Sequence, residues 1–320
     1  MRGTPRDTLY YQTIVDHDPT LILVACIIFL VVNAMPGDPA LTVLGAEMEG
    51  DYELVKERMG LNGTIWERLW RWLSGVLQGD LGESYFLGTS VWDAIKTRIP
   101  VTVSLATAAL VVAVIIGIPL GIIASLKPNS ALDTAISSVS LLGLCTPEFF
   151  GGLTFILLFA IQIRAFPSGG YKPLSGGAGQ WAKYIFLPAF TYGFKQAAYF
   201  ARLMRSSMLE VLNQDFITTA TAKGQKKTVV IMKHALRNAL LPIVTGVGMT
   251  YTMMLGGAFI TESLFRLPGT GLLIINSIAK RDFPVVCGTL LLISAAILII
   301  NLLVDILYAF IDPRVRFGKK

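Results

Sequence analysis

Charged residues are scarce in this chain: Asp, Glu, Lys and Arg make up 15% of its 320 residues, whereas 53% of the residues are hydrophobic. Soluble domains carry about 25% charged residues, so a water-soluble fold with this composition would expose large apolar patches. The mean hydropathy of +0.62 agrees with this exclusion. A bilayer core about 30 Å thick needs roughly 20 apolar residues per helix, so the chain has room for several spans and sizeable loops. The composition therefore predicts an integral membrane protein.

Residue types that carry catalysis or bind metals are also few. The two histidines, His17 and His234, lie in unrelated contexts, and no Cys, His and carboxylate cluster has metal-ligand spacing. The chain has no Walker A sequence, so we do not expect it to hydrolyse ATP, and no nucleophile with a nearby base is evident. We expect no catalytic residue, no metal site and no cofactor bound by this chain itself.

Cysteine is limited to Cys26, Cys145 and Cys287, each in or beside an apolar run. An odd number without paired spacing argues against a disulfide framework, so the thiols are expected to behave as small hydrophobic residues. A cleavable signal is not indicated, because the first apolar run meets Pro36-Gly-Asp-Pro39 instead of a small-residue cleavage site. The first run is therefore predicted to be a retained transmembrane helix.

Long apolar runs, by contrast, are abundant. They predict an all-α integral membrane protein with six transmembrane helices, and a small helical extracytoplasmic subdomain between the first two. The first run is the shortest, and the fourth is interrupted by Lys195 and Gln196. The six runs lie near residues 20–35, 101–126, 134–163, 184–204, 238–261 and 285–311.

The placement of Lys and Arg predicts the orientation of these spans. Both termini, the 127–133 turn and the 202–237 loop together carry 14 basic and seven acidic residues, whereas the opposite side carries 12 basic and 13 acidic residues. Because loops rich in Lys and Arg stay on the cytoplasmic side, both termini and the 202–237 loop are predicted to be cytoplasmic.

Three segments follow from this topology. Residues 1–39 are the cytoplasmic N-terminus and first transmembrane helix, residues 40–100 the extracytoplasmic helical subdomain, and residues 101–320 the transmembrane core, with a cytoplasmic loop at about 205–237. In the subdomain, Trp66, Trp70 and Trp72 fit either the lipid headgroup level or the core of the subdomain, and both interpretations stay open.

The cytoplasmic loop is the most informative segment. Asp215 is predicted to cap a short helix that runs from Phe216 to Lys223, and Gly224 to end it at the position after the C-cap. A helix that exposes Ala220 and Ala222 beside Phe216 can dock into a cleft on a partner. An ordinary solvated helix on the membrane surface is the alternative, and the residues alone do not decide between the two.

The loop resembles a known sequence element. Its residues Asp215-Phe-Ile-x-Thr-Ala-x-Ala-Lys-Gly224 and His234-Ala-Leu-Arg-Asn-Ala-Leu-Leu-Pro242 are similar to the EAA-type loop of binding-protein-dependent ABC importer permeases, in the variant of the dipeptide/oligopeptide/nickel family. Further landmarks occur in order along nearly the whole chain, including Pro36-Gly-Asp-Pro39, Gly79-Asp-Leu-Gly82, Arg205-Ser-Ser-Met-Leu-Glu-Val-Leu212, Pro268-Gly-x-Gly271 and Arg281-Asp-Phe-Pro284.

The resemblance implies the permease fold of type I ABC importers and a role as one permease subunit for short peptides. The implied partners are a homologous second permease, two ATP-binding subunits, an extracytoplasmic solute-binding protein, the peptide substrate and membrane lipids, without nucleic acid. ATP and Mg would be bound by the ATPase subunits. The implied location is the inner or plasma membrane of a prokaryote, as a multi-pass protein.

The resemblance also implies which residues couple the chain to ATP hydrolysis. In the family, the short cytoplasmic helix lies in a groove of the ATPase subunit and transmits its closure to the membrane helices. Added bulk at Ala222 or Gly224 would block a close backbone approach. By position, the coupling residues are Glu210, Asp215, Phe216, Ala220, Ala222, Lys223 and Gly224.

Polar groups inside apolar runs are candidates for the transport pathway, because ionisable residues in a membrane are costly. Glu148 follows Pro147 in the third run, where a proline break can open the backbone to a pathway. Glu262 lies at the outer end of the fifth run, where a gate or a receptor-docking role competes with plain solvation.

Other functions remain open at this stage. Within the same family, the substrate can be nickel, glutathione, haem or an oligosaccharide instead of a peptide. An ATP-independent secondary transporter or channel is the alternative from another class, although no inverted repeat supports it. An intramembrane enzyme is disfavoured by the missing catalytic constellation.

Overall fold

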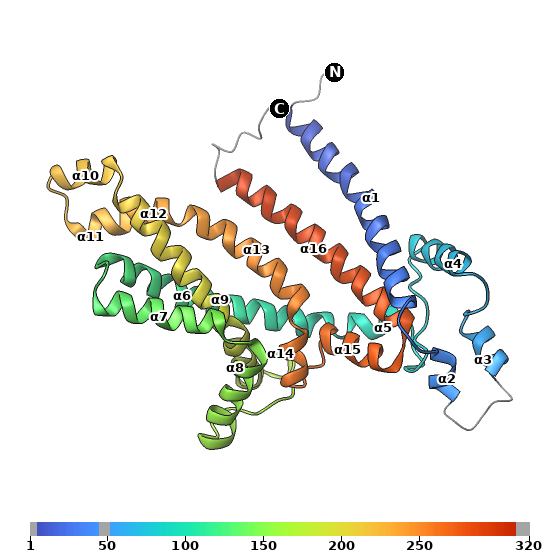
Figure 1. Ribbon diagram of the computed structural model, residues 1–320. Helices are drawn as coiled ribbons and strands as arrows, with labels where there is room; N and C mark the ends of the chain where they lie inside the picture. The colour runs from blue at the N-terminus through green and yellow to red at the C-terminus, as the bar shows by residue number, and fades with distance from the viewer. Residues whose placement is uncertain (1–4, 45–51, 312–320) are drawn as a thin grey trace. The chain divides into compact units, whose positions relative to one another are not determined.

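The computed structural model describes residues 5–44 and 52–311 (Figure 1). Throughout this part of the chain the regular secondary structure is helical, and the one β-type contact is an isolated bridge between Glu83 and Ser90. The predicted all-α class is therefore confirmed for the described residues. The chain divides into two compact units, of which the first combines Met1–Pro100 with Pro268–Ile299 and the second combines Val101–Leu267 with Ile300–Lys320.

The first unit contains the N-terminal helices and a later helical segment. Its helices are α1 (Pro5–Asn33), α2 (Pro39–Leu44), α3 (Tyr52–Arg58), α4 (Ile65–Leu77), α5 (Val91–Lys96), α15 (Thr270–Lys280) and the first part of α16 (Phe283–Ile311). Helix α4 begins with a reciprocal cap, in which the Glu67 N–H donates to Thr64 Oγ1 at 3.4 Å and the Thr64 N–H donates to Glu67 Oε2 at 2.9 Å. Two backbone donors at the helix start are satisfied in this way.

Helix α4 packs on α1 through aromatic side chains. The rings of Phe29 and Trp72 lie 5.5 Å apart between centroids, within a cluster that also contains Val32, Phe283 and Cys287. The exposed fractions of Trp66 and Trp70 are 66% and 71%. Packing in the core of the subdomain therefore applies to Trp72, which lies against this cluster. Trp66 and Trp70 instead project from the surface of α4.

The turn between α15 and α16 links distant parts of the first unit. Asp282, which is almost fully buried, accepts hydrogen bonds from the Ser84 hydroxyl and from the Tyr85 N–H. The neighbouring Arg281 donates to the carbonyl oxygen of Pro36 and to Thr42 Oγ1 at 3.3 and 3.1 Å. These contacts fix the segments that follow α1 and α4 against the start of α16.

The second unit contains a longer succession of helices. They are α6 (Ile99–Leu126), α7 (Ala131–Cys145), α8 (Glu148–Phe155), the π-helix η2 (Ile156–Gln162), the 3₁₀ turn η3 (Leu174–Gly176), α9 (Ala178–Leu212), α10 (Asp215–Ala222), α11 (Lys227–Val229), the π-helix η4 (Val230–Ala235), α12 (Leu236–Ala239), α13 (Leu241–Gly257) and α14 (Phe259–Leu264).

Small residues bring α6 and α9 into close contact. A Cβ atom added to Gly117 or Gly121 would lie 2.5 Å from the carbonyl oxygen of Ala197 or Ala201, and one added to Gly193 would overlap the backbone of Ala109. All three glycines are buried. Because lipid tails are as apolar as the helix surfaces, packing of this kind is a main source of helix association in a bilayer.

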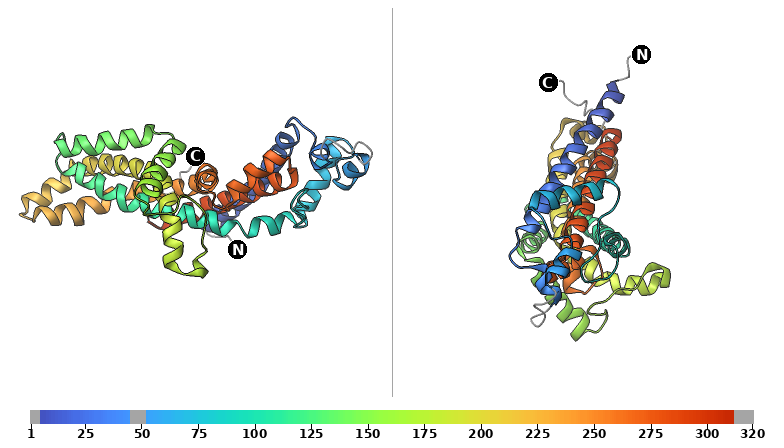
Figure 2. Two further views of the ribbon diagram at one scale, coloured as in Figure 1. Left: turned by 90° about the horizontal axis from the view of Figure 1, so that it is seen from below. Right: turned by 90° about the vertical axis from the view of Figure 1, so that its right-hand side faces the viewer.

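The predicted third and fifth spans are bent in the structure. Helices α7 and α8 meet at 109° around Thr146 and Pro147, and the segment Lys227–Ala239 meets α13 at 46°, just before Pro242 (Figures 1 and 2). Proline has no N–H and disfavours a helical residue before it, which explains the break at Thr146. The third apolar run is therefore not one straight helix.

The described residues contain two helical segments that are each long and apolar enough to cross a membrane, Val91–Leu126 and Phe283–Val304, or up to four if each bent pair forms one span. Two shorter apolar helices, Pro19–Asn33 and Thr270–Lys280, fall below that length. The run at 184–204 lies within α9, which is not among the helices apolar enough to cross a membrane. Lys195 and Gln196 lower the hydropathy of this run. Six spans stay a prediction.

The α6–α9 contact leads to a test of stability. Gly121→Ala is expected to destabilise the protein by about 1–3 kcal/mol, because the added methyl group overpacks the contact with Ala201 and Met204. The melting temperature of the full chain in detergent measures this. Gly179→Ala, in the first turn of α9 where a Cβ meets nothing within 4 Å, is the matched control and should melt at or above the wild-type temperature. Equal melting of both variants would contradict the packing argument.

Candidate functional site

The short helix α10 lies between the end of α9 and the polar segment that leads to α11 (Figure 1). It begins at Asp215, and its N-cap is Gln214, which makes no side-chain capping hydrogen bond. The prediction that Asp215 is the cap is therefore wrong by one residue, since Asp215 is already helical. Its carboxylate still lies in the first turn, where a negative charge interacts favourably with the helix dipole.

Gly224 ends α10 as predicted. Its φ is +75°, and the C-cap before it is Lys223. The Gly224 N–H donates to the carbonyl oxygen of Thr221 at 2.9 Å, and the Gln225 N–H donates to that of Ala220 at 3.4 Å. These two bonds form a Schellman motif, which requires a left-handed residue and favours glycine. A Cβ at Gly224 would meet nothing within 4 Å, so the requirement for glycine within this chain is conformational.

One face of α10 is packed and the other is exposed. Ile217 and Ala220, one helical turn apart, have exposed fractions of 6% and 8%, and both belong to a cluster with Met208, Val211 and Val230. The expectation that Ala220 is exposed is therefore wrong, because this position faces the protein and fixes the helix. The exposed face carries Phe216, which is 38% exposed, together with Asp215, Thr218, Thr219, Ala222 and Lys223.

The same cluster connects α10 with the membrane helices. It continues through Phe200 and Met204 of α9 to Ala113 of α6 and to Ile243 of α13. Two polar contacts fix the segment that follows α10. The Ser207 hydroxyl on α9 donates to the carbonyl oxygen of Ala239 at 2.9 Å, and His234 Nε2 lies 2.8 Å from Gln225 Oε1. Packed side chains therefore link α10 to α9, α6 and α13.

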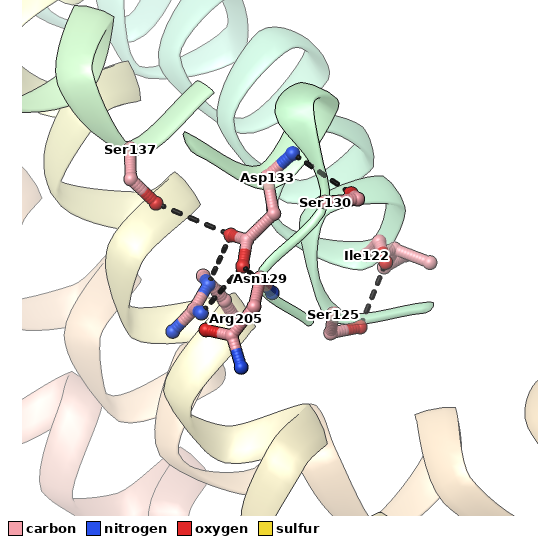
Figure 3. Close-up of polar contacts among 7 residues, drawn as sticks. All are labelled: Ile122, Ser125, Asn129, Ser130, Asp133, Ser137 and Arg205. Carbon is pink, nitrogen blue, oxygen red and sulfur yellow. Dashed lines mark hydrogen bonds and ion pairs between the residues drawn. The ribbon is translucent and has the colours of Figure 1, made fainter. Parts of the chain in front are cut away.

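A buried ion pair joins α7 to α9 (Figure 3). Arg205 Nε and one terminal nitrogen donate to the two carboxylate oxygens of Asp133 at 2.6 and 2.7 Å, and Asp133 is 3% exposed. The carboxylate also accepts the Asn129 N–H at 2.9 Å and the Ser137 hydroxyl at 3.3 Å. A paired, bidentate charge with its remaining acceptors filled is the geometry that makes a buried ion pair tolerable.

No pattern in the sequence pairs Asp133 with Arg205. In the sequence, Asp133 is one of the charges of the turn predicted to be cytoplasmic, and Arg205 begins the landmark motif that precedes the loop. The one hint of a pair in the sequence was that the two opposite charges are predicted to lie on the same side of the membrane. Their 72-residue separation meant that only the fold could pair them.

The three candidates for the pathway lie around α14. Pro147 is the N-cap residue of α8, and Glu148 is its first helical residue. The Thr261 hydroxyl donates to Glu148 Oε1, and the next residue, Glu262, accepts the Thr102 hydroxyl at 2.6 Å. Adjacent residues of α14 therefore contact α8 on one side and α6 on the other.

The burial of Glu262 excludes one of its two interpretations, plain solvation. Its exposed fraction is 0%, so plain solvation does not explain this carboxylate in the described structure. Thr102 and Thr261, with exposed fractions of 4% and 0%, are the partners that the sequence did not indicate. Hydroxyl groups in apolar runs are common, and only the tertiary contacts distinguish these two. A charged or hydrogen-bonded group buried at this depth is typical of a site that constrains helix positions.

Among the described residues, no group of three or more His, Cys, Asp or Glu side chains is placed to hold a metal ion. The cysteines in that part of the chain, Cys26, Cys145 and Cys287, are all free thiols. Of the seven predicted coupling residues, all except Ala220 are exposed, and they lie at the end of α9, along α10 and at its C-terminal turn.

Comparison with protein families gives two matches. The family described as "Binding-protein-dependent transport system inner membrane component" matches residues 117–317, and the model for the N-terminal part of such membrane components matches residues 12–106. Together the two matches cover most of the chain.

Curated relatives match over nearly the full length. A putative peptide transport system permease protein of Brucella abortus is 38% identical over 300 residues, which cover 93% of this chain and 96% of that protein. The glutathione transport system permease protein GsiC of Escherichia coli (strain K12) is also 38% identical over 300 residues, covering 93% and 95%.

Solved structures share the fold at low sequence identity. An inward-facing structure of the MetNI methionine ABC transporter matches with a TM-score of 0.56 at 16% identity, over 68% of this chain and 95% of that chain. An amino acid ABC transporter crystallised with histidines matches with a TM-score of 0.50 at 15% identity, over 76% and 98%.

The buried ion pair leads to a double-mutant test. Asp133→Asn is expected to destabilise the protein, because Arg205 then keeps a partly buried charge without its counter-charge. Asp133→Asn combined with Arg205→Gln should recover part of this loss, with a coupling energy of about 0.5–3 kcal/mol. Equilibrium unfolding in mixed micelles measures the four proteins of the cycle. Strictly additive losses would show that the pair contributes no interaction energy.

The Schellman motif leads to a second test. Gly224→Val is expected to raise the rate of tryptic cleavage after Lys223, Lys226 or Lys227, because a left-handed backbone costs a β-branched residue about 1–2 kcal/mol or more. Gly224→Asn is the control, since asparagine adopts this conformation more readily. Asparagine should stay near the wild-type rate. Equal cleavage of all three proteins would contradict the conformational role of Gly224.

Proposed function

The chain belongs to the family of binding-protein-dependent transport system inner membrane components, and from this premise we propose that it forms, with a homologous second permease, the membrane pathway for import of short peptides. The family itself consists of permease components of ABC importers. Membership supports an ATP-driven permease component over the ATP-independent secondary transporter and over an intramembrane enzyme. The arrangement of α10 is the single observation that supports the coupling role most directly.

Helix α10 has the properties of a docking element. Its inner face is fixed by Ile217 and Ala220, so its outer face keeps a defined orientation. The exposed residues of the helix include the partly exposed Phe216, the small Ala222 and the charged Asp215 and Lys223. An apolar anchor flanked by polar residues is the usual composition of a helix that enters a groove on a partner. The proposed partner is the ATP-binding subunit.

Each coupling residue has a role in this proposal. Phe216 and Ala222 enter the groove, Asp215, Lys223 and Glu210 contact its polar rim, and Ala220 fixes the helix to this chain. Gly224 turns the chain away through the Schellman motif. ATP and Mg would be bound by the partner subunits, since the sequence has no Walker A motif.

Movement of α10 would reach the membrane helices along two routes. One route is the apolar cluster that continues from Ile217 to α9, α6 and α13. The other is the Asp133–Arg205 pair, which ties α9 to the start of α7 and therefore to the bend at Pro147. Because packed cores switch between discrete arrangements and do not deform continuously, a small displacement at α10 can be converted into a helix movement.

Pro147, Glu148 and Glu262 are the proposed elements of the pathway or gate. The bond from Thr261 to Glu148 and the bond from Thr102 to Glu262 tie α8 and α6 to adjacent residues of α14. A change in the angle between α7 and α8 would break or remake the first of these bonds. Alternating access in this proposal therefore includes a polar contact that is made in one state only.

Short peptides are the proposed substrate class, because the names of curated relatives include peptide transport system permeases. Relatives named as glutathione permeases are equally similar, so glutathione, itself a short peptide, is the first alternative. Nickel, haem or an oligosaccharide are further alternatives within the family. The solute-binding protein would supply much of the selectivity.

The proposed location is the inner or plasma membrane of a prokaryote, with both termini and α10 on the cytoplasmic side. The excess of Lys and Arg in the termini and the 202–237 loop supports this orientation. The solute-binding protein would then approach the opposite side, where residues 40–100 are predicted to lie.

Affinity purification with a tag on this chain tests the proposal. The expected result is recovery of a second permease and ATPase subunits, with ATP hydrolysis stimulated by the loaded solute-binding protein. Phe216→Ala should weaken ATPase recovery by about tenfold or more, because a central apolar anchor is lost. Leu126→Ala removes a residue that is similarly exposed, at 37%, on the predicted cytoplasmic side and should leave recovery unchanged.

A chain that purifies without ATPase subunits, yet moves solute in liposomes without ATP, would overturn the proposal. Unchanged ATPase recovery by Phe216→Ala, together with normal stimulated hydrolysis, would remove Phe216 from the docking surface. Transport assays with a dipeptide, glutathione and nickel then separate the substrate alternatives.

A further inference from the structure

The first unit contains a cavity of about 530 Å³ that the proposed transport function does not use. Three arginines line it: Arg58 at the end of α3, and Arg68 and Arg71 on α4. Its volume lies within the roughly 300–1,000 Å³ that is usual for small-molecule sites. The apolar side of the cavity is formed by Phe29, Trp72, Leu81, Phe283, Pro284 and Cys287.

The arginines have no carboxylate partner among the described residues. The ion pairs found there are Lys96–Asp93 and Arg205–Asp133, neither of which involves the cavity. Arg68 donates to the side-chain oxygen of Asn33, and Arg71 donates to the carbonyl oxygen of Gly60 at 3.2 Å. Each guanidinium has five N–H donors, so these neutral contacts leave donors for an anion.

Two acidic residues line the cavity beside the three arginines. They are Asp80 and Glu83, which leaves an excess of one positive charge. Asp80 Oδ1 accepts the Gly82 N–H at 2.8 Å, and the nearby Asp282 accepts Ser84 and the Tyr85 N–H. Burial raises the pKa of Tyr85 to about 12, so this phenol stays neutral at physiological pH.

The helix ends that line the cavity are predicted to lie at the level of the lipid headgroups. Phe29 and Asn33 belong to the last turns of α1, at the end of the apolar segment Pro19–Asn33, whereas Phe283, Pro284 and Cys287 belong to the first turns of the span Phe283–Val304. Both helix ends are predicted to face the extracytoplasmic side. On α4, Trp66 and Trp70 are exposed, as is typical of tryptophans at the membrane interface.

We propose that this cavity binds the headgroup of an anionic phospholipid, with its phosphate on Arg58, Arg68 and Arg71 and the start of an acyl chain along Phe29 and Phe283. Arginine suits this role because its planar fork donates two parallel hydrogen bonds to a phosphate. The amphipathic lining distinguishes a lipid from a soluble anion, which would not require the apolar side. The bound lipid would fix α4 and the 80–85 segment to the ends of α1 and α16.

Native mass spectrometry of the full chain with its co-purifying subunits tests the proposal. The probes are phosphatidylglycerol and phosphatidylcholine with identical acyl chains, each titrated separately, and inorganic phosphate as a soluble competitor. One phosphatidylglycerol should bind about tenfold or more tightly than phosphatidylcholine, and phosphate at equal concentration should not displace it.

Variants locate the site. Arg58→Gln with Arg71→Gln should weaken phosphatidylglycerol binding by about tenfold or more while leaving the Arg68–Asn33 contact intact, so the fold is retained. Adding Arg68→Gln should abolish the preference for the anionic lipid. The control replaces three exposed basic residues outside the cavity, Arg164, Lys172 and Lys183, with glutamine and should bind lipid as the wild type does.

Three outcomes would overturn the proposal. One is equal binding of the two lipids, the second is an equal loss in the control variant, and the third is displacement by inorganic phosphate, which would assign the arginines to a soluble anion. ATPase recovery by the tagged chain is measured in the same preparations. Failure of the lipid site and failure of the proposed transport function are therefore observed separately.

Discussion

Close backbone approach between α6 and α9 is the contact on which the second unit depends. In a bilayer, apolar side chains gain little by leaving lipid for another helix, so association relies on packing at short range and on a few hydrogen bonds. Gly117, Gly121 and Gly193 allow α9 to lie directly against α6. Helix α9 then continues to Leu212, and two residues separate its end from the proposed docking helix α10.

Polar contacts supply the specificity that packing alone does not. The Asp133–Arg205 pair, the Thr102–Glu262 bond and the Thr261–Glu148 bond each join two different helices. A buried polar group without its partner is expensive, so each contact favours one arrangement of its helices over neighbouring ones. The bend at Pro147 directly precedes Glu148, and a proline break frees backbone groups that a continuous helix would satisfy. The unit thus combines close-packed helices with a small number of polar contacts that can be exchanged.

The first unit follows a different principle. Its helix α4 is amphipathic and begins with the reciprocal cap between Thr64 and Glu67. It packs on α1 through the contact of Trp72 with Phe29. Asp282 and Arg281 draw the segments around Ser84 and Pro36 together, which leaves an arginine-lined cavity at the ends of two apolar helices. Here three arginines outnumber the two acidic residues that line the same cavity. The proposed occupant is therefore a molecule that carries both an anionic group and an apolar chain.

The sequence by itself determined the membrane class, the helical fold and the end of α10 at Gly224, because composition, apolar periodicity and a left-handed glycine are local properties. The family followed from the resemblance of its motifs to those of known permeases. The sequence misplaced the N-cap of α10 by one residue and expected Ala220 at the surface, since the direction of a side chain depends on which helix face meets the cluster formed with α9 and η4. It also did not pair Asp133 with Arg205, separate Trp72 from Trp66 and Trp70, or bury Glu262. Those outcomes depend on residues that are far apart in the chain, and only the tertiary structure decides which of them meet.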